Sequence, residues 1–219
     1  MNLKKSLSQH VEYILRKKIM LLELKEGEHL KESSLAEELN ISRGPIREAI
    51  KKLEFEGLVN TTSSGRTLVA KFDLQYVRNL YKVRTLLETY AVQNISKEVI
   101  EQVGLKLKKL LNEMQDCIKN NKQYLENDFN IHYEIVQMSQ NQTLIQSWLA
   151  HKDLFITLIE VTTEATKARN NDIFKEHEEI VAAILNQNLH EASEKLEEHL
   201  MNASNYYSNA VFKLINEEA

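Results

Sequence analysis

Turn-forming residues are scarce in this chain, which contains five glycines and one proline among its 219 residues. A fold of many short strands needs frequent tight turns, and glycine and proline supply most of them. The scarcity therefore predicts a mainly α-helical fold. A chain of this length accommodates one large domain or two modest ones.

The composition is typical of a globular protein that does not enter a membrane. Hydrophobic residues make up 42% of the chain and charged residues 27%. No apolar run is long enough to span a bilayer, and the basic N-terminus lacks the apolar core of a signal peptide. Cys117 is the single cysteine, which excludes an internal disulfide and fits a reducing compartment. We therefore expect a cytoplasmic protein with no membrane partner.

Two short helices joined by three residues are predicted between residues 31 and 57. Apolar residues recur at helical spacing in KESSLAEEL, and residues 40–42 connect that segment to RGPIREAIKKLEFEGL. Ser42 is a good N-cap, Pro45 is tolerated in a first helical turn, and Gly57 ends the helix. This arrangement is a helix-turn-helix, whose second helix enters the major groove of DNA by its N-terminal end.

Further elements complete the pattern of a winged helix-turn-helix. A first helix is expected over Val11–Leu24, where apolar residues again follow helical spacing. Two strands are expected over Leu58–Thr62 and Arg66–Ala70, closing on a turn at residues 63–65. We therefore predict an N-terminal winged helix-turn-helix domain over residues 1–71.

The N-terminal end of the second predicted helix carries Arg43, Gly44 and Arg47, on the side away from the apolar residues. Arginines in this position can pair with guanine edges or clamp phosphates. The sequence therefore predicts double-stranded operator DNA as a partner.

The run HLKESSLAEELNISRGPIREAIKKLEFEGLV closely resembles the winged-helix domain of the GntR family of bacterial regulators. The resemblance implies a phosphate contact from Ser33 and a wing tip at Gly65. It also implies DNA contacts from the start of the second helix, at Ser42, Arg43 and Arg47. One departure is Gly44, which stands where the family commonly has threonine, and this change is expected to alter the base preference.

The remainder of the chain shows no strand pattern. Apolar residues at helical spacing and short polar joints predict six helices, with a seventh left open. Their expected ranges are about 74–95, 97–121, 123–139, 142–166, 171–187 and 189–216. We predict that residues 72–219 form an antiparallel helical bundle.

Several of these predicted helices carry a polar residue within the apolar stripe. Asp128 and His132 lie four residues apart and hence on one helix face, while His177 and His199 interrupt the last two stripes. Because an unpaired buried charge is costly, such groups should find one another or a ligand. One carboxylate and three imidazoles suit a divalent ion such as Zn, Ni or Mn, with one or two positions open. Arg84, on a further stripe, offers a two-pronged donor to a carboxylate that fills an open position.

The resemblance to known regulators continues through this region. The segments RTLLE (residues 84–88), DFNIH (128–132) and EHEEI (176–180), with His199, are similar to the landmarks of the FCD domain of the FadR subfamily. The resemblance implies metal ligation by one aspartate and three histidines in this order, hence by Asp128, His132, His177 and His199. It also implies a small organic acid as effector and a homodimer bound to a palindromic operator.

The sequence thus predicts a ligand-responsive repressor, in which an organic acid held by the metal and Arg84 weakens operator binding. Two alternatives stay open at this point. In the first, the metal ion is itself the signal. In the second, the metal activates water in a hydrolase, although the stripes offer no inward carboxylate beyond Glu88 as a general base. A purely structural metal is a further possibility.

Overall fold

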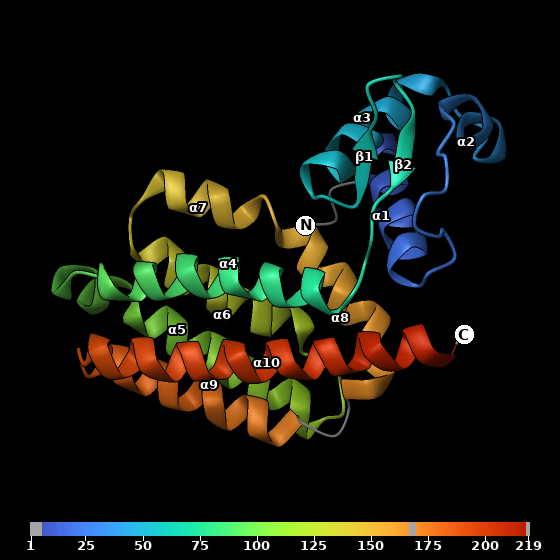
Figure 1. Ribbon diagram of the computed structural model, residues 1–219. Helices are drawn as coiled ribbons and strands as arrows, with labels where there is room; N and C mark the ends of the chain where they lie inside the picture. The colour runs from blue at the N-terminus through green and yellow to red at the C-terminus, as the bar shows by residue number, and fades with distance from the viewer. Residues whose placement is uncertain (1–5, 167–169, 218–219) are drawn as a thin grey trace. The chain divides into compact units, whose positions relative to one another are not determined.

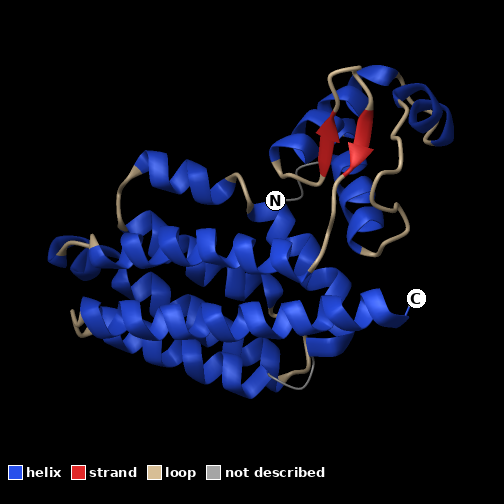
Figure 2. Ribbon diagram, viewed as in Figure 1, coloured by secondary structure: helices blue, strands red, loops and turns tan. Residues whose placement is uncertain are grey.

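The computed structural model describes residues 6–166 and 170–217. Helices dominate these residues, and Figure 2 shows two short strands (red) as the exception. The mainly α-helical fold that the scarcity of turn residues predicted is therefore confirmed. No described helix combines the length and the apolarity that crossing a bilayer would need.

The N-terminal part is a winged helix-turn-helix (Figure 1), as predicted. Its elements are α1 (Leu7–Met20), α2 (Glu32–Glu38), α3 (Arg43–Phe55), β1 (Val59–Thr61) and β2 (Thr67–Val69). Helices α1 and α2 both contact α3, and the strands pair antiparallel with Val59 opposite Val69. The first helix begins at Leu7, earlier than expected, because Ser6 and Gln9 form a reciprocal capping box.

A buried ion pair helps to close the core of this part. Arg16 on α1 and Glu56 after α3 are 1% and 7% exposed, and two hydrogen bonds of 2.8 Å join the guanidinium to the carboxylate. Burial of either charge alone would be costly, so the bidentate pairing is what makes the arrangement stable. The hydroxyl of Tyr76 donates to the Glu56 carbonyl at 2.7 Å and so ties the segment after the wing to the end of α3.

Seven helices follow within the described residues. They are α4 (Leu74–Gln93), α5 (Lys97–Lys119), α6 (Leu125–Met138), α7 (Gln142–Leu149), α8 (Lys152–Thr166), α9 (Asn170–Leu185) and α10 (Leu189–Glu217). Figure 1 shows α4, α5, α6, α9 and α10 running lengthwise beside one another, and α5 contacts both α6 and α9. Gly104 on α5 permits a close approach, because an added β carbon would lie 2.7 Å from Leu185 Cδ2 on α9.

The single helix expected over residues 142–166 is wrong. Helix α7 ends at Leu149, and α8 begins at Lys152 after a two-residue turn. In that turn the amide of Ala150 donates to the Gln146 carbonyl, and the amide of His151 donates to the Trp148 carbonyl. No glycine, proline or asparagine marks the break, so the apolar spacing runs through it without a visible signal. The described residues after the wing therefore hold seven helices, the number that the sequence left open beside six.

The chain divides into two compact units, and each is considered by itself. One comprises the residues up to Tyr76 together with Asp153–Thr162 and the end of α10 from Asn209. The other comprises Val77–Lys152 and Thr163–Ser208, and it contains every candidate metal ligand named above. The domain boundary expected between residues 71 and 72 stays a prediction.

Candidate functional site

Four side chains from three helices converge inside the second unit. Asp128 and His132 come from α6, one turn apart, His177 comes from α9 and His199 from α10. Each offers one donor atom, and the four atoms all lie within 4.8 Å of one another. The Nε2 atom of His177 is 3.1 Å from His132 Nε2 and 3.2 Å from Asp128 Oδ1. The candidate ligand set inferred from the apolar stripes is thus brought together in the fold.

The outer nitrogen of each imidazole is held by an oxygen acceptor. His132 Nδ1 donates to Glu88 Oε2 at 2.6 Å, and His199 Nδ1 donates to Glu176 Oε2 at 2.7 Å. His177 Nδ1 donates to the backbone carbonyl of Ile173 at 2.7 Å. Because carboxylate and carbonyl oxygens only accept, each Nδ1 carries a proton, and Nε2 is the nitrogen of each ring that faces the centre. Metal-binding histidines in proteins are oriented in this way.

The pKa shifts of the three histidines indicate where the cluster holds a proton. Burial lowers the pKa of His132, and burial together with the charge of His177 lowers the pKa of His199 to about 4. Burial has the same tendency at His177, but hydrogen bonding to Asp128 outweighs it and raises the pKa. Hydrogen bonding thus favours a proton on His177 Nε2, which lies 3.2 Å from Asp128 Oδ1 and 3.1 Å from His132 Nε2. A divalent cation could replace this proton, because three imidazole nitrogens and one carboxylate are its ordinary ligands.

Buried charges around the cluster form a second layer. Burial opposes ionisation of Glu88 and Asp128, but Arg84 and His132 hold the pKa of Glu88 well below its usual range, and His177 does the same for Asp128. Arg84 and Glu88 are 3% and 0% exposed, and the Asp128 side chain is 14% exposed. The two carboxylates exceed the one guanidinium by one negative charge, which a proton on His177 or a bound cation would neutralise.

Glu88 was named from the sequence as an inward carboxylate, but its partners in this site were not foreseen. Its Oε1 accepts from Arg84 Nε and from Trp148 Nε1, each at 2.7 Å. Its spacing of four from Arg84 was visible, but such pairs usually lie on solvated helix faces. Arg84, which we expected to receive an effector carboxylate, therefore already has its Nε on an internal carboxylate.

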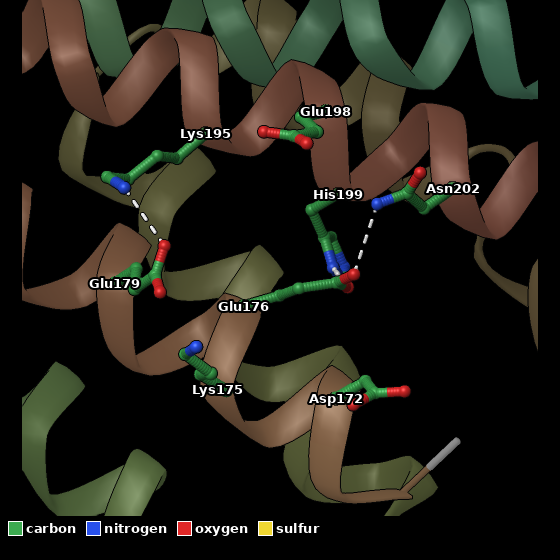
Figure 3. A pocket seen from close by; sticks show the side chains of 8 residues that line it. All are labelled: Asp172, Lys175, Glu176, Glu179, Lys195, Glu198, His199 and Asn202. Carbon is green, nitrogen blue, oxygen red and sulfur yellow. Dashed lines mark hydrogen bonds and ion pairs between the residues drawn. The ribbon is translucent and has the colours of Figure 1, made fainter. Parts of the chain in front are cut away.

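A surface cavity of about 290 Å³ opens beside His199, between α9 and α10 (Figure 3). Figure 3 shows Glu176 between His199 and Asn202, and Asn202 Nδ2 donates to Glu176 Oε1 at 3.1 Å. The side chain of Glu176 is 23% exposed, while that of His199 is 6% exposed. The carboxylate that orients His199 is therefore the part of the cluster's surroundings that water reaches through this cavity.

The predicted DNA-contacting residues all lie on the surface of the winged part. Ser42 is the N-cap of α3, and Arg43, Gly44 and Arg47 follow it in the first turns of that helix. Ser33 is exposed on α2, and Gly65 is exposed in the turn between the strands, with a φ of +77° that favours glycine. The Ser42 side chain makes no capping hydrogen bond to the helix.

Glu32 on α2 holds one of these arginines. Arg47 Nε and Nη2 donate to the two carboxylate oxygens of Glu32 at 3.1 and 3.0 Å. The pair is exposed, with side-chain fractions of 60% for Arg47 and 34% for Glu32. Sequence reasoning missed Glu32, because pairing across two helices depends on their packing and not on spacing along one helix.

Comparison with known proteins agrees with both halves of the structure. Residues 7–69 match the bacterial regulatory proteins of the gntR family, and residues 79–202 match the FCD domain. Fold and matches together define a class of protein, the transcriptional regulators that bind DNA through a helix-turn-helix. Within that class, the chain belongs to the GntR family and carries an FCD domain. It is a regulator and not an enzyme. This family assignment excludes the alternative that the chain is a metal-dependent hydrolase.

The relatives and structural neighbours are regulators. The chain is 28% identical over 188 residues to the HTH-type transcriptional regulator YdhC of Bacillus subtilis, covering 84% of each protein. It is 28% identical over 222 residues to the transcriptional repressor NanR of Escherichia coli, covering 92% of this chain and 84% of NanR. The structure of Lar, which controls the expression of the Listeria monocytogenes agr system, superposes with a TM-score of 0.69 at 19% identity, covering 95% of this chain and 99% of that one. The metal-free FCD domain of TM0439 gives a TM-score of 0.53 at 20% identity over 66% of this chain and 99% of that one.

Proposed function

We propose that this regulator is a repressor whose C-terminal domain holds a divalent metal ion and a small organic acid, and that the acid modulates operator binding. Asp128, His132, His177 and His199 would hold the metal. The observation that carries this proposal is the orientation of the three imidazoles, each with Nδ1 held from outside and Nε2 toward the centre. Zn, Ni and Mn are the ions that this donor set favours.

The charges around the cluster support an organic acid as the effector. Asp128 and Glu88 carry two negative charges and Arg84 one positive charge, while the more exposed Glu176 is screened by water. A divalent ion would leave this buried group with one surplus positive charge, which a monocarboxylate would neutralise. When bound, the ion would supply Lewis-acid attraction for a carboxylate at the coordination positions that four protein donors leave open. Arg84 would stabilise the same carboxylate from its side of the cluster.

The N-terminal end of α3 and the wing would read the operator. The proposed contacts are Ser33, Ser42, Arg43, Gly44, Arg47 and Gly65. Their exposure supports this assignment, since none of them is needed in the core of the winged part. Arg43→Ala is expected to abolish specific binding in a gel-shift assay, while Lys119→Ala, which removes a positive charge from α5, leaves binding unchanged. Equal binding by the two variants would contradict the proposed docking.

We also propose that the regulator acts as a homodimer, with one recognition helix for each half of a palindromic operator. Val83, Leu86 and Tyr90 support this, because they lie on one face of α4 and are 43%, 69% and 50% exposed. Exposed apolar stripes of this kind commonly mark an interface. Leu86→Glu is expected to shift the protein toward monomer in sedimentation velocity. A wild-type protein that sediments as a monomer at micromolar concentration would contradict the proposal.

The test of the whole proposal is a thermal-shift screen of metal-loaded and metal-stripped protein against small carboxylic acids. A ligand at 100 times its dissociation constant should stabilise the protein by about 2.7 kcal/mol. We expect an acid that raises the melting temperature of the metal-loaded protein only. The same acid should change the affinity for operator DNA by about 5- to 150-fold, the usual size of coupling between two binding sites.

Two other results would overturn parts of the proposal. If the metal ion alone changes operator affinity and no acid has an effect, the protein is a metal sensor. If stripping lowers the melting temperature but neither metal nor acid changes operator affinity, the metal is structural. If the protein takes up no divalent ion at all, the metal part of the proposal is contradicted, and the proposal that the protein binds operator DNA still stands.

A further inference from the structure

Glu88 is a wholly buried carboxylate that serves two partners at once. Its side chain is 0% exposed and lies on α4, outside the set of four candidate ligands. One oxygen, Oε2, accepts from His132 Nδ1 at 2.6 Å. The other, Oε1, accepts from Arg84 Nε and Trp148 Nε1, both at 2.7 Å. Three donors from α4, α6 and α7 therefore meet on one side chain.

Both edges of this side chain must accept hydrogen bonds. Oε2, which faces His132, must accept a hydrogen bond from His132 Nδ1. Only then does Nδ1 carry the proton, so that Nε2 of the same ring offers its lone pair to the centre. The edge toward Arg84 and Trp148 must accept as well, because a guanidinium and an indole nitrogen only donate. Glutamate has acceptors on both edges. Glutamine has one acceptor and one donor, so in either flip it leaves a donor facing a donor.

An ion pair that only stabilised the fold would not need this arrangement. Arg84 and Glu88 are four residues apart on one helix, and pairing between them requires one carboxylate oxygen alone. Here the second oxygen is directed to a candidate ligand on another helix. Trp148 holds the first oxygen from α7, so the carboxylate is fixed in orientation from both sides.

We propose that Glu88 is a positioning residue for the metal centre, which sets the tautomer and orientation of His132 while Arg84 and Trp148 hold it in place. This inference rests on the proposed metal site and extends it to a residue outside the ligand set. Outer carboxylates that orient histidine ligands typically contribute a factor of about 10 to 100 in metal affinity.

The experiment compares Glu88→Gln with Glu134→Gln in the full-length protein. Glu134 is a matched control, since it is also buried, lies on α6 beside the ligands and forms an ion pair with Lys106. Affinity for Zn²⁺ is measured by competition with a chromogenic chelator, and the visible absorption of bound Co²⁺ reports the ligand field. We expect Glu88→Gln to weaken Zn²⁺ binding about 10- to 100-fold and to change the Co²⁺ spectrum. The control should match wild type in both.

A second measurement on wild-type protein covers the case in which Glu88→Gln does not fold. In the metal-stripped protein, where no metal ion dictates the tautomer, long-range ¹⁵N–¹H correlation spectra should show His132 with its proton on Nδ1. Wild-type affinity in the Glu88→Gln variant, or a His132 that lacks the Nδ1 proton, would overturn the role of Glu88 and leave the metal site standing. A wild-type protein that binds no Zn²⁺ would overturn the metal site and this inference together.

Discussion

Histidines within a helical core usually serve as ordinary packing residues with one hydrogen bond. The three histidines of this cluster differ from that pattern. In each of them Nδ1 donates a hydrogen bond to an oxygen, and Nε2 faces the common centre; they are His132, His177 and His199. The spacing of Asp128 and His132 on one helix face was visible in the sequence, and so were the interrupted stripes that carry the other two. The pairings of Glu88 with His132 and of Glu176 with His199 were not visible, since each joins two different helices, whereas the Ile173 carbonyl lies one turn before His177 on α9.

The first residue-scale prediction concerns His177, the histidine that contacts both His132 and Asp128. His177→Ala removes one of four donors and the one that bridges the cluster. We expect at least a 100-fold loss of Zn²⁺ affinity by chelator competition. His190→Ala is the control, because the His190 side chain is 87% exposed and remote from the cluster along α10. Retention of wild-type affinity in His177→Ala would exclude this cluster as the metal site.

The second residue-scale prediction concerns Glu32, whose pKa is lowered by its hydrogen bonds from Arg47. A carboxylate with a lowered pKa in the folded state stabilises the protein above its unfolded pKa, and that stability is lost as the pH falls through the folded pKa. Glu32→Gln should therefore lower the melting temperature slightly at pH 7, and the difference from wild type should shrink as the pH falls below about 4.3, the ordinary glutamate pKa, and vanish below the lowered pKa of the folded state. Solvent screening keeps the effect small.

The matched control for this pair is Glu37→Gln, which neutralises an exposed glutamate on the same helix. A difference in melting temperature between wild type and Glu32→Gln that does not change with pH would show that the ion pair contributes nothing to stability.

Glu32→Gln should also bind non-specific duplex DNA more tightly, with the salt dependence of binding steeper by about one unit, because Arg47 is then available to a phosphate.

At the scale of the elements, periodicity predicted most helices well and failed where two helices meet without a turn residue. At residues 150 and 151 the backbone turns with no local breaker in the sequence, and Trp148 just before the turn is buried. The reverse holds for the start of α1, where Ser6 and Gln9 are a visible capping box that lies before the apolar residues. A capping box can be recognised in a sequence, whereas a helix break without a turn-forming residue cannot.

The prediction at this scale concerns the contact between α5 and α9. Gly104→Leu must displace Leu185 on α9, so we expect a loss of about 1 to 3 kcal/mol in the free energy of unfolding. Gly44→Leu is the matched control, because no atom lies within 4 Å of the β carbon it would add on α3. Urea denaturation measures both. Equal stability in the two variants would show that the α5–α9 contact is loose.

At the scale of the whole molecule, the buried charges of the second unit explain why metal and stability should be linked. Hydrogen bonding to Asp128 raises the pKa of His177 and so favours a proton there in the absence of a cation, while Arg84 compensates Glu88. A bound divalent ion would replace that proton and join three helices through four bonds. Binding to the folded state alone then adds directly to its stability.

The prediction at this scale is that chelator-treated protein melts lower than protein loaded with Zn²⁺. With free Zn²⁺ at 100 times its dissociation constant, the difference should be about 5 to 10 °C for a chain of this size. Differential scanning calorimetry of both states measures it. The His177→Ala variant should show no such difference, and a shift of wild-type size in that variant would place the stabilising ion elsewhere.

The sequence by itself determined the class of fold, the winged helix-turn-helix and the identities of the four candidate ligands. These features depend on short-range rules, namely turn composition, helical periodicity and spacing on one face, which a chain expresses locally. Only the tertiary structure decided the break between α7 and α8, the pairing of Arg47 with Glu32, and the place of Glu88 between Arg84, Trp148 and His132. Each of these depends on which helices pack together, and a buried carboxylate finds its partners across helices that are far apart along the chain.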